Sequence, residues 1–223
     1  MPEPLRLALT VPPPVEPISL AEAKTFLRVD ISNDDALIGS LVTAARDACE
    51  RFTGRALVMQ TWTLFRDDWP GRARADAHLT EGAQTGPFAA ARGAVIEIPK
   101  PPLLSIEHVK TTDDADTATV WPAGNYLVDT ASEPGRLIVR AGAALPEAAR
   151  TANGIEIRFV AGYAPDESVS PSDLLANIPG GLVEGIRRLT AYLYEHRGDC
   201  GADEAAALSG ATLLWRPYRV MRL

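Results

Sequence analysis

The stretch Ile18-Ser19-Leu20-Ala21-Glu22 marks the point where the regular part of the chain begins. The Ser19 hydroxyl can cap the amide of Glu22, and the Glu22 carboxylate can reach back to the amide of Ser19, which is the reciprocal pattern of a capping box. The apolar positions that follow share one face at helical spacing, namely Leu20, Ala23, Phe26 and Leu27. This pattern predicts an amphipathic helix that ends near Val29.

A second helix is predicted from a similar start at Ser32-Asn33-Asp34-Asp35 to about Thr53, with Gly54 as its C-terminal stop. Its predicted apolar stripe consists of Leu37, Leu41, Ala44, Ala45, Ala48, Cys49 and Phe52. Its predicted polar side consists of Arg46, Asp47, Glu50 and Arg51. Because Cys49 lies on the apolar stripe, we interpret it as a small core residue and not as a nucleophile.

A third helix is predicted after Asn177-Ile178-Pro179, because proline suits the first turn of a helix. Its apolar positions recur at steps of four, three and four residues, at Leu182, Ile186, Leu189 and Leu193. Gly198 is the predicted stop. We expect this helix to pack on the two N-terminal helices, so that residues 18–55 and 173–200 form one helical bundle.

The middle of the chain changes from helical to alternating periodicity, which is typical of strands. Strands are predicted within residues 56–66, 95–98, 105–111, 126–129, 137–140 and 155–160, and around Trp121. The fold class is therefore α+β: a small helical bundle with an inserted β-rich unit over residues 56–165. Residues 67–93 form a long irregular segment in this unit, which we interpret as a solvated insertion.

Both ends of the chain have distinctive composition. Residues 1–17 contain six prolines, which favour an extended arm that either lies across a neighbour or leads into the first helix as a solvated segment. Residues 201–223 are predicted to form an extended C-terminal tail for partner docking. Its last part combines large apolar side chains with arginines, as interface anchors do, in Leu213, Leu214, Trp215, Arg216, Pro217, Tyr218, Arg219, Val220, Met221, Arg222 and Leu223. The alternative is that this part forms a final strand or docks on its own domain.

Composition argues against several classes of function. The formal net charge of -7 does not suit a general nucleic-acid-binding surface, and two cysteines support neither a disulfide framework nor a zinc site. No apolar run approaches the length of a membrane span, and the proline-interrupted N-terminus lacks the pattern of a signal peptide. We therefore expect a cytoplasmic origin. We also expect no metal and no cofactor, because the histidines lack suitable spacing and Asp113, Asp114 and Asp116 are better explained by a polar hairpin tip than by a calcium loop.

A resemblance to a known family rests on several motifs taken in order. These are Pro17-Ile18-Ser19-Leu20-Ala21-Glu22-Ala23-Lys24, Phe52-Thr53-Gly54-Arg55, Gln60-Thr61-Trp62, the run Tyr192-Leu193-Tyr194-Glu195-His196-Arg197-Gly198, and Pro217-Tyr218-Arg219. Together they resemble the head-tail connector (adaptor) proteins of tailed phages and gene transfer agents. The resemblance covers both ends of the chain, whereas residues 67–93 are unlike the compact turns expected there.

The resemblance implies a structural protein without enzymatic activity. Its subunits would form a ring, a dodecamer in that family, in the neck of a virion or gene-transfer-agent particle assembled in the bacterial cytoplasm. The portal protein would bind one side and a stopper or tail-completion protein the other, while DNA passes through the channel without sequence-specific binding. Residues 213–223 would be the portal-binding segment. The alternative is a small hydrolase or carbohydrate-active domain on the β-rich unit, for which Asp67 and Asp68 beside Trp69 are the candidate carboxylates.

Overall fold

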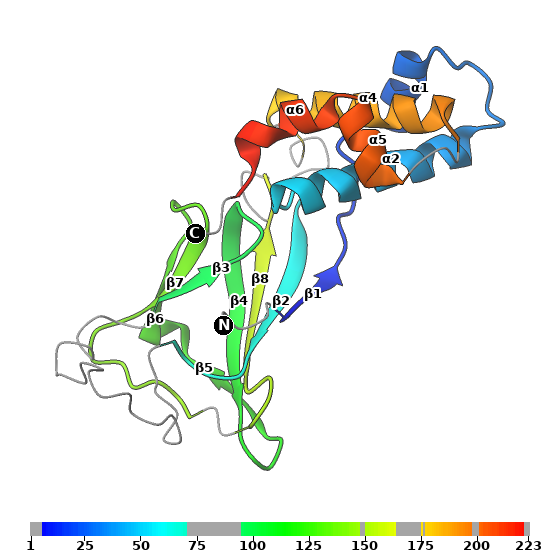
Figure 1. Cartoon of the computed structure of the whole chain (residues 1–223). Helices are drawn as coiled ribbons and strands as arrows, with labels where there is room; N and C mark the ends of the chain where they lie inside the picture. Colours follow the sequence, from blue (N-terminus) through cyan, green and yellow to red (C-terminus); the bar gives the residue numbers. More distant parts are fainter. Residues whose placement is uncertain are drawn as a thin grey trace. The chain divides into compact units, whose positions relative to one another are not determined.

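The computed structural model describes residues 6–70, 95–147, 150–163, 175, 177–197 and 201–220. The chain has an α+β fold, as predicted, and divides into two compact units. The helical unit comprises Pro13–Gln60, Lys100–Pro102 and Ala161–Leu223, and the β unit comprises Met1–Pro12, Thr61–Pro99 and Leu103–Val160. The sequence colouring of Figure 1 shows that both ends of the chain contribute helices to the helical unit.

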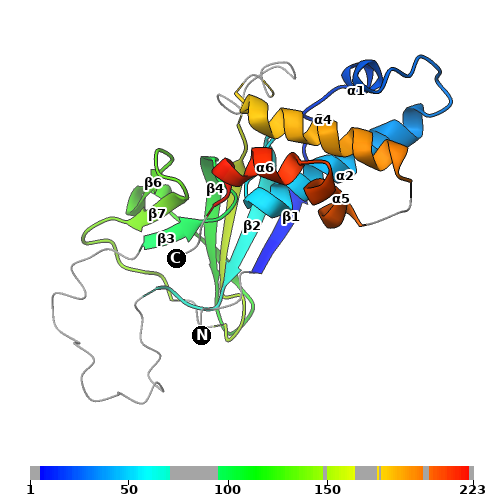
Figure 2. The same ribbon diagram turned by 45° about the horizontal axis from the view of Figure 1, so that its top comes forward.

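The helical unit is built around two long helices, α2 (Asp35–Thr53) and α4 (Gly180–Glu195), which pack on each other. Among the described residues, three shorter helices pack on this pair: α1 (Leu20–Leu27), α5 (Ala202–Leu208) and α6 (Ala211–Trp215). Figure 2 shows α1 on the other side of α4 from α5 and α6. The α2–α4 pair therefore carries helices from both chain ends.

The predicted helix boundaries rest on local signals that the structure confirms. Ser19 caps α1 through its side chain, and Glu22 completes the capping box with a bond to the Ser19 amide. Gly54 ends α2 with φ 75°, a left-handed conformation that glycine adopts without steric cost. Pro179 precedes the first turn of α4, where its missing amide leaves no helical bond unmade.

The buried face of α2 differs from the predicted stripe. Ala45, Ala48 and Cys49 are buried as expected, but Leu37, Leu41, Ala44 and Phe52 are only half-buried. The buried face includes Ile38 and Val42 and, contrary to the predicted polar side, also Arg46 and Glu50. The prediction for these two charged residues was wrong because polar partners outside α2 satisfy them, as described below.

The described part of the β unit forms two sheets. The five-stranded sheet has the order β1-β2-β8-β4-β5, formed by β1 (Arg6–Val11), β2 (Gln60–Arg66), β8 (Ile155–Ala161), β4 (Leu103–Thr112) and β5 (Ala118–Trp121). The three-stranded sheet has the order β3-β7-β6, formed by β3 (Val95–Ile98), β7 (Gly135–Val139) and β6 (Tyr126–Asp129). The predicted strands are thus present.

The N-terminal arm predicted over residues 1–17 is a strand over part of its length. Residues 6–11 form β1, which pairs antiparallel with β2 so that Leu7 lies opposite Leu64. The prolines on both sides of β1 leave room for this short strand at the edge of the sheet, where missing amides are tolerated. Residues 1–5 lie outside the described residues.

An aromatic cluster lies in the core of the β unit. Trp69 and Trp121 meet edge to face with ring centroids 5.1 Å apart, and Trp121 lies 5.3 Å from Tyr126. The indole nitrogen of Trp69 donates to the carbonyl of Pro146 at 2.9 Å, which satisfies its polar atom in the core. Trp69 thus anchors residues 67–70, at the start of the predicted long loop, in the β unit. Residues 71–94 lie outside the described residues.

Candidate assembly interface

The C-terminal segment, residues 211–220, folds onto its own helical unit. The expectation of an extended tail is wrong for these residues: α6 is followed by a 3₁₀ turn over Arg216–Tyr218, and α6 packs on α2 and α4. The alternative kept open from the sequence, docking on its own domain, describes this part of the chain. Met221, Arg222 and Leu223 lie outside the described residues.

Trp215 is the residue that holds the C-terminal segment in place. Its side chain is fully buried, its indole nitrogen donates to the carbonyl of Leu182 at 3.2 Å, and its ring lies 6.0 Å from the ring of Phe52. Gly185 on α4 makes the room, because a β-carbon there would lie 2.1 Å from the indole nitrogen. A tryptophan buried against a helical glycine is a packed core contact and not a free anchor.

A second set of contacts fixes the residues after Trp215. Arg55 donates from Nε to the carbonyl of Tyr218 at 2.6 Å and from Nη1 to the hydroxyl of Tyr163 at 3.0 Å. The amide of Val220 donates to the carbonyl of Thr53 at 2.8 Å, at the C-terminal end of α2. The bonds to Tyr218 and Thr53 use carbonyls at the ends of the 3₁₀ turn and of α2, which otherwise need water or other partners.

The outer side of the C-terminal segment is basic and partly apolar. Leu213 is 72% exposed, and Arg216, Pro217 and Arg219 are also exposed. The guanidinium of Arg219 lies 5.6 Å from the centre of the Phe52 ring. No acidic residue occurs from Ala211 to Val220. We call Leu213, Arg216, Pro217 and Arg219 the C-terminal patch.

The predicted portal-binding residues thus separate into groups. The C-terminal patch is accessible to a partner, whereas Trp215 is buried and Leu214, Tyr218 and Val220 are half-buried. Their role in binding a portal stays a prediction. The sequence did carry a sign of this docking, because Gly181 and Gly185 are four residues apart on α4 and each approaches the segment: a β-carbon at Gly181 would lie 3.2 Å from Tyr218.

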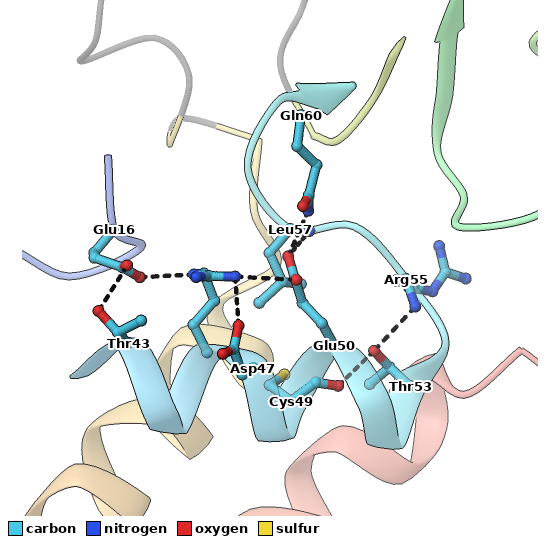
Figure 3. Close-up of polar contacts among 10 residues, drawn as sticks. Glu16, Thr43, Asp47, Cys49, Glu50, Thr53, Arg55, Leu57 and Gln60 are labelled. Carbon is cyan, nitrogen blue, oxygen red and sulfur yellow. Dashed lines mark hydrogen bonds and ion pairs between the residues drawn. The ribbon is translucent and has the colours of Figure 1, made fainter. Parts of the chain in front are cut away.

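Sequence reasoning missed a buried charged network on α2. The side chains of Arg46 and Glu50 are only 8% and 7% exposed and form an ion pair of 3.1 Å. Arg46 also contacts Glu16 at 2.8 Å, and Figure 3 shows Glu16 reaching this side of α2 from the N-terminal segment. The second oxygen of Glu50 accepts from the amide of Leu57 at 2.9 Å and from the Gln60 side chain at 2.8 Å.

The network ties the chain on both sides of α2 to the helix. Burial raises the pKa of Glu50, against the opposing effects of the Leu57 amide and of Arg46. Burial works to lower the pKa of Arg46, but the Glu50 and Glu16 carboxylates outweigh it, so the pKa of Arg46 is raised. A buried charge of this kind is tolerated only with such partners. The arrangement positions the backbone segments on both sides of α2.

Polar contacts join the N-terminal end of α2 to the C-terminal end of α4. The hydroxyl of Tyr194 donates to the carboxylate of Asp34 at 2.6 Å, and Arg197 contacts the same oxygen at 3.1 Å. The hydrogen bond from Tyr194, aided by Arg197, lowers the pKa of Asp34. The side chain of Asp34 therefore binds Tyr194 of α4 and makes no capping hydrogen bond to its own helix, α2.

The residues proposed for alternative chemistry have structural partners. Asp67 pairs with Arg6 and accepts from the amide of Asn153 at 2.7 Å, and Asp68 accepts from the amide of Trp69 at 2.8 Å. Burial raises the pKa of the Cys49 thiol, which agrees with a core role. Within the parts of the chain that the structure describes, no cluster of three or more His, Cys, Asp or Glu residues has the geometry to hold a metal ion. No described helix is long and apolar enough to span a bilayer.

Comparison with known proteins adds a family and a fold. Residues 17–84 match the family model described as phage gp6-like head-tail connector protein. This region contains α1, α2 and β2, and thus the capping box and the helix pair on which the resemblance was based. No curated protein sequence matches the chain.

Chains in solved structures of gene transfer agent particles are similar to this one. A chain in the neck of an empty gene transfer agent particle computed with C6 symmetry is 22% identical with a TM-score of 0.69, and the match covers 98% of this chain and 97% of that chain. A chain in the virion of a native particle is 22% identical with a TM-score of 0.70, and the match covers 97% and 96%. A chain in the neck of a native particle computed with C12 symmetry is 24% identical with a TM-score of 0.65, and the match covers 98% and 96%.

At this identity the structural likeness establishes the fold, and it extends from one end of the chain to the other. The resemblance inferred from the sequence is thereby confirmed: residues 17–84 match the phage gp6-like head-tail connector family, and the chain as a whole has the fold of chains from gene transfer agent particles.

Proposed function

We propose that this protein is a head-tail connector subunit in the neck of a gene transfer agent or related phage-like particle. The observation that carries the proposal is the end-to-end agreement in fold with a neck chain, over 98% of this chain and 97% of the other. The family match over residues 17–84 supports the same role independently of the fold. Because the match covers nearly the whole chain, it includes the β unit as well as the helices.

The connector acts as a ring, which we propose to be a dodecamer. The neck structures that contain the similar chains were computed with C6 and C12 symmetry, which agrees with a cyclic assembly. The portal protein binds one side of the ring and a stopper or tail-completion protein the other. DNA passes through the channel of the ring without sequence-specific binding. The net charge of -7 suits a channel wall that does not bind the DNA passing through it.

The C-terminal patch, with residues 221–223, is the portal-binding site in this proposal. Trp215 is its internal support, since it fixes α6 on the bundle and thereby fixes the direction of the exposed side chains. Leu213 offers an apolar contact, while Arg216 and Arg219 can each bind a carboxylate in bidentate fashion. Many identical contacts around a ring add up even when each is weak.

The protein performs this role without turnover. A hydrolase on the β unit would need a carboxylate pair directed into an open site, whereas the Asp67 and Asp68 carboxylates accept bonds from neighbouring side chains and amides. We therefore retain one function.

The portal-binding role is tested by charge reversal on the C-terminal patch. Truncation before Ala211 is unsuitable because it would remove Trp215 from the core. We expect Arg216→Glu/Arg219→Glu to lower the affinity for purified portal particles about tenfold or more, since opposed charges at an interface are replaced by like charges. Arg188→Glu, a single charge reversal at an exposed position of α4, is the control for charge reversal away from the patch, with expected wild-type binding. Equal binding by the double variant and the control would refute the patch as the portal site.

A further inference from the structure

We propose that neighbouring subunits in the ring join their five-stranded sheets edge to edge, β5 of one copy pairing with β1 of the next. The proposal rests on the ring of the proposed function and identifies the surfaces that close it. The partner is a second copy of this chain. Backbone hydrogen bonds supply the contact, as in strand addition at a free sheet edge.

The five-stranded sheet ends in β1 on one side and β5 on the other. Among the described residues, neither strand has a further strand on its outer side. The residues of β5 from Ala118 to Val120 are exposed, with Val120 at 55%, and those of β1 from Ala8 onward are exposed, with Leu9 at 46%. Exposed edges with apolar side chains invite pairing unless they are protected.

The hydrogen-bond pattern shows which groups of β5 point outward. The amide of Asp113 donates to the carbonyl of Thr117 across the β4–β5 turn, while the amide of Thr112 donates to Gly154 on the opposite side of β4. Because antiparallel pairs alternate between bonded and non-bonded types, the pair of Thr112 with Ala118 and the pair of Lys110 with Val120 are non-bonded. Ala118 and Val120 therefore direct their amides and carbonyls to the free edge.

The other edge offers a strand of matching length. The register of β1 against β2 is regular from Arg6 to Leu9 and shifts between Leu9 and Val11. The regular part has four residues, as does β5. Neither strand contains the lysines that often protect edges, and the only charge, Arg6, is paired with Asp67.

A ring requires two different surfaces on each subunit, because a surface that binds its own copy gives a closed dimer. The two edges of one sheet meet this requirement. Pairing of β5 with β1 repeats around a ring, whereas pairing of β1 with β1 would stop at two copies. Cyclic symmetry in the related necks agrees with the first arrangement.

The first test removes one outward donor without breaking the sheet. Proline at position 120 lacks the amide that points away from β4, so the β4–β5 ladder keeps its bonds. We expect Val120→Pro to raise the concentration needed for ring formation about tenfold, the effect of losing roughly one hydrogen bond and the close approach at each interface. Val120→Thr keeps the amide and should assemble as the wild type does. Unchanged assembly of Val120→Pro, with a wild-type circular dichroism spectrum, would overturn the proposal.

The second test does not depend on a destabilising variant. In a chain with Cys200→Ser, Leu9→Cys and Val120→Cys are combined and treated with a short bifunctional thiol reagent, with portal particles present. We expect a ladder of linked oligomers only when both cysteines are in the same chain. Dimers from Leu9→Cys alone, or no ladder in rings seen by microscopy, would overturn edge pairing while leaving the connector function intact. A wild-type chain that forms no rings at all would instead count against the proposed function.

Discussion

Replacing Gly185 by alanine tests whether the C-terminal segment is a packed part of the helical unit. A β-carbon at this position would lie 2.1 Å from the Trp215 indole nitrogen and 2.8 Å from two ring carbons. Trp215 is fully buried and bonded to Leu182, so its rigid ring cannot step aside. The alanine therefore forces either α4 or α6 to move.

The expected magnitude follows from opposing effects. Alanine favours a helix interior by about 1 kcal/mol over glycine, but overpacking costs about 1–3 kcal/mol and a lost hydrogen bond about 1 kcal/mol more. We expect a net loss of about 1–3 kcal/mol in the free energy of unfolding. Gly39 on α2 is the control, because a β-carbon there meets nothing within 4 Å. Gly39→Ala should stabilise the protein by about 0.5–1 kcal/mol.

The assay is equilibrium unfolding in urea, followed by the helical signal in circular dichroism. A double-mutant cycle with Trp215→Ala isolates the contact, because Gly185→Ala should lose its cost once the indole is absent. Trp215→Ala alone should cost about 3–5 kcal/mol. If Gly185→Ala and Gly39→Ala stabilised the protein equally, the C-terminal segment would not be docked, and the reasoning would be refuted.

Two further predictions concern titrating groups. The pKa of Glu50 is raised in the folded state, so the contribution of Glu50 to stability falls as the pH rises from the unfolded pKa of 4.5 through the raised folded pKa. Over that pH range, urea unfolding should show the free energy of unfolding of the wild type decreasing relative to that of Glu50→Gln. A difference that stays constant with pH would contradict the burial of the charge. A hydrogen bond from Ser132, together with Arg136, lowers the pKa of Asp129 to about 2. Ser132→Ala should therefore raise the pKa of Asp129, measured by NMR titration, toward 3.8. An unchanged pKa would show that the serine is not the cause.

The elements that sequence reasoning predicted well depend on neighbouring residues. The capping box of Ser19 and Glu22 and the glycine stop at Gly54 act within a few residues, so their chemistry is visible in the sequence. The alternation of the β unit is equally local. These signals suffice for the fold class and for most boundaries.

The errors concern contacts between distant segments. Arg46 and Glu50 were placed on a polar face because charged residues are normally exposed, yet Glu16, Leu57 and Gln60 satisfy them in the interior. The prediction that Trp215 is an exposed anchor for another protein was wrong. Composition indicates that an apolar segment packs against something, but it does not show whether that surface belongs to the same chain or to another protein. The space beside Gly185 lies in the same chain, and two glycines of α4, Gly181 and Gly185, were the sign of it in the sequence.

Imaging the wild-type protein with purified portal particles tests the central claim most directly. Electron microscopy of the mixture should show a cyclic layer of additional density on one face of the portal, consistent with a dodecamer, that depends on the added protein. Portals that stay bare at saturating protein concentration, together with an absence of rings from the protein alone, would contradict the account.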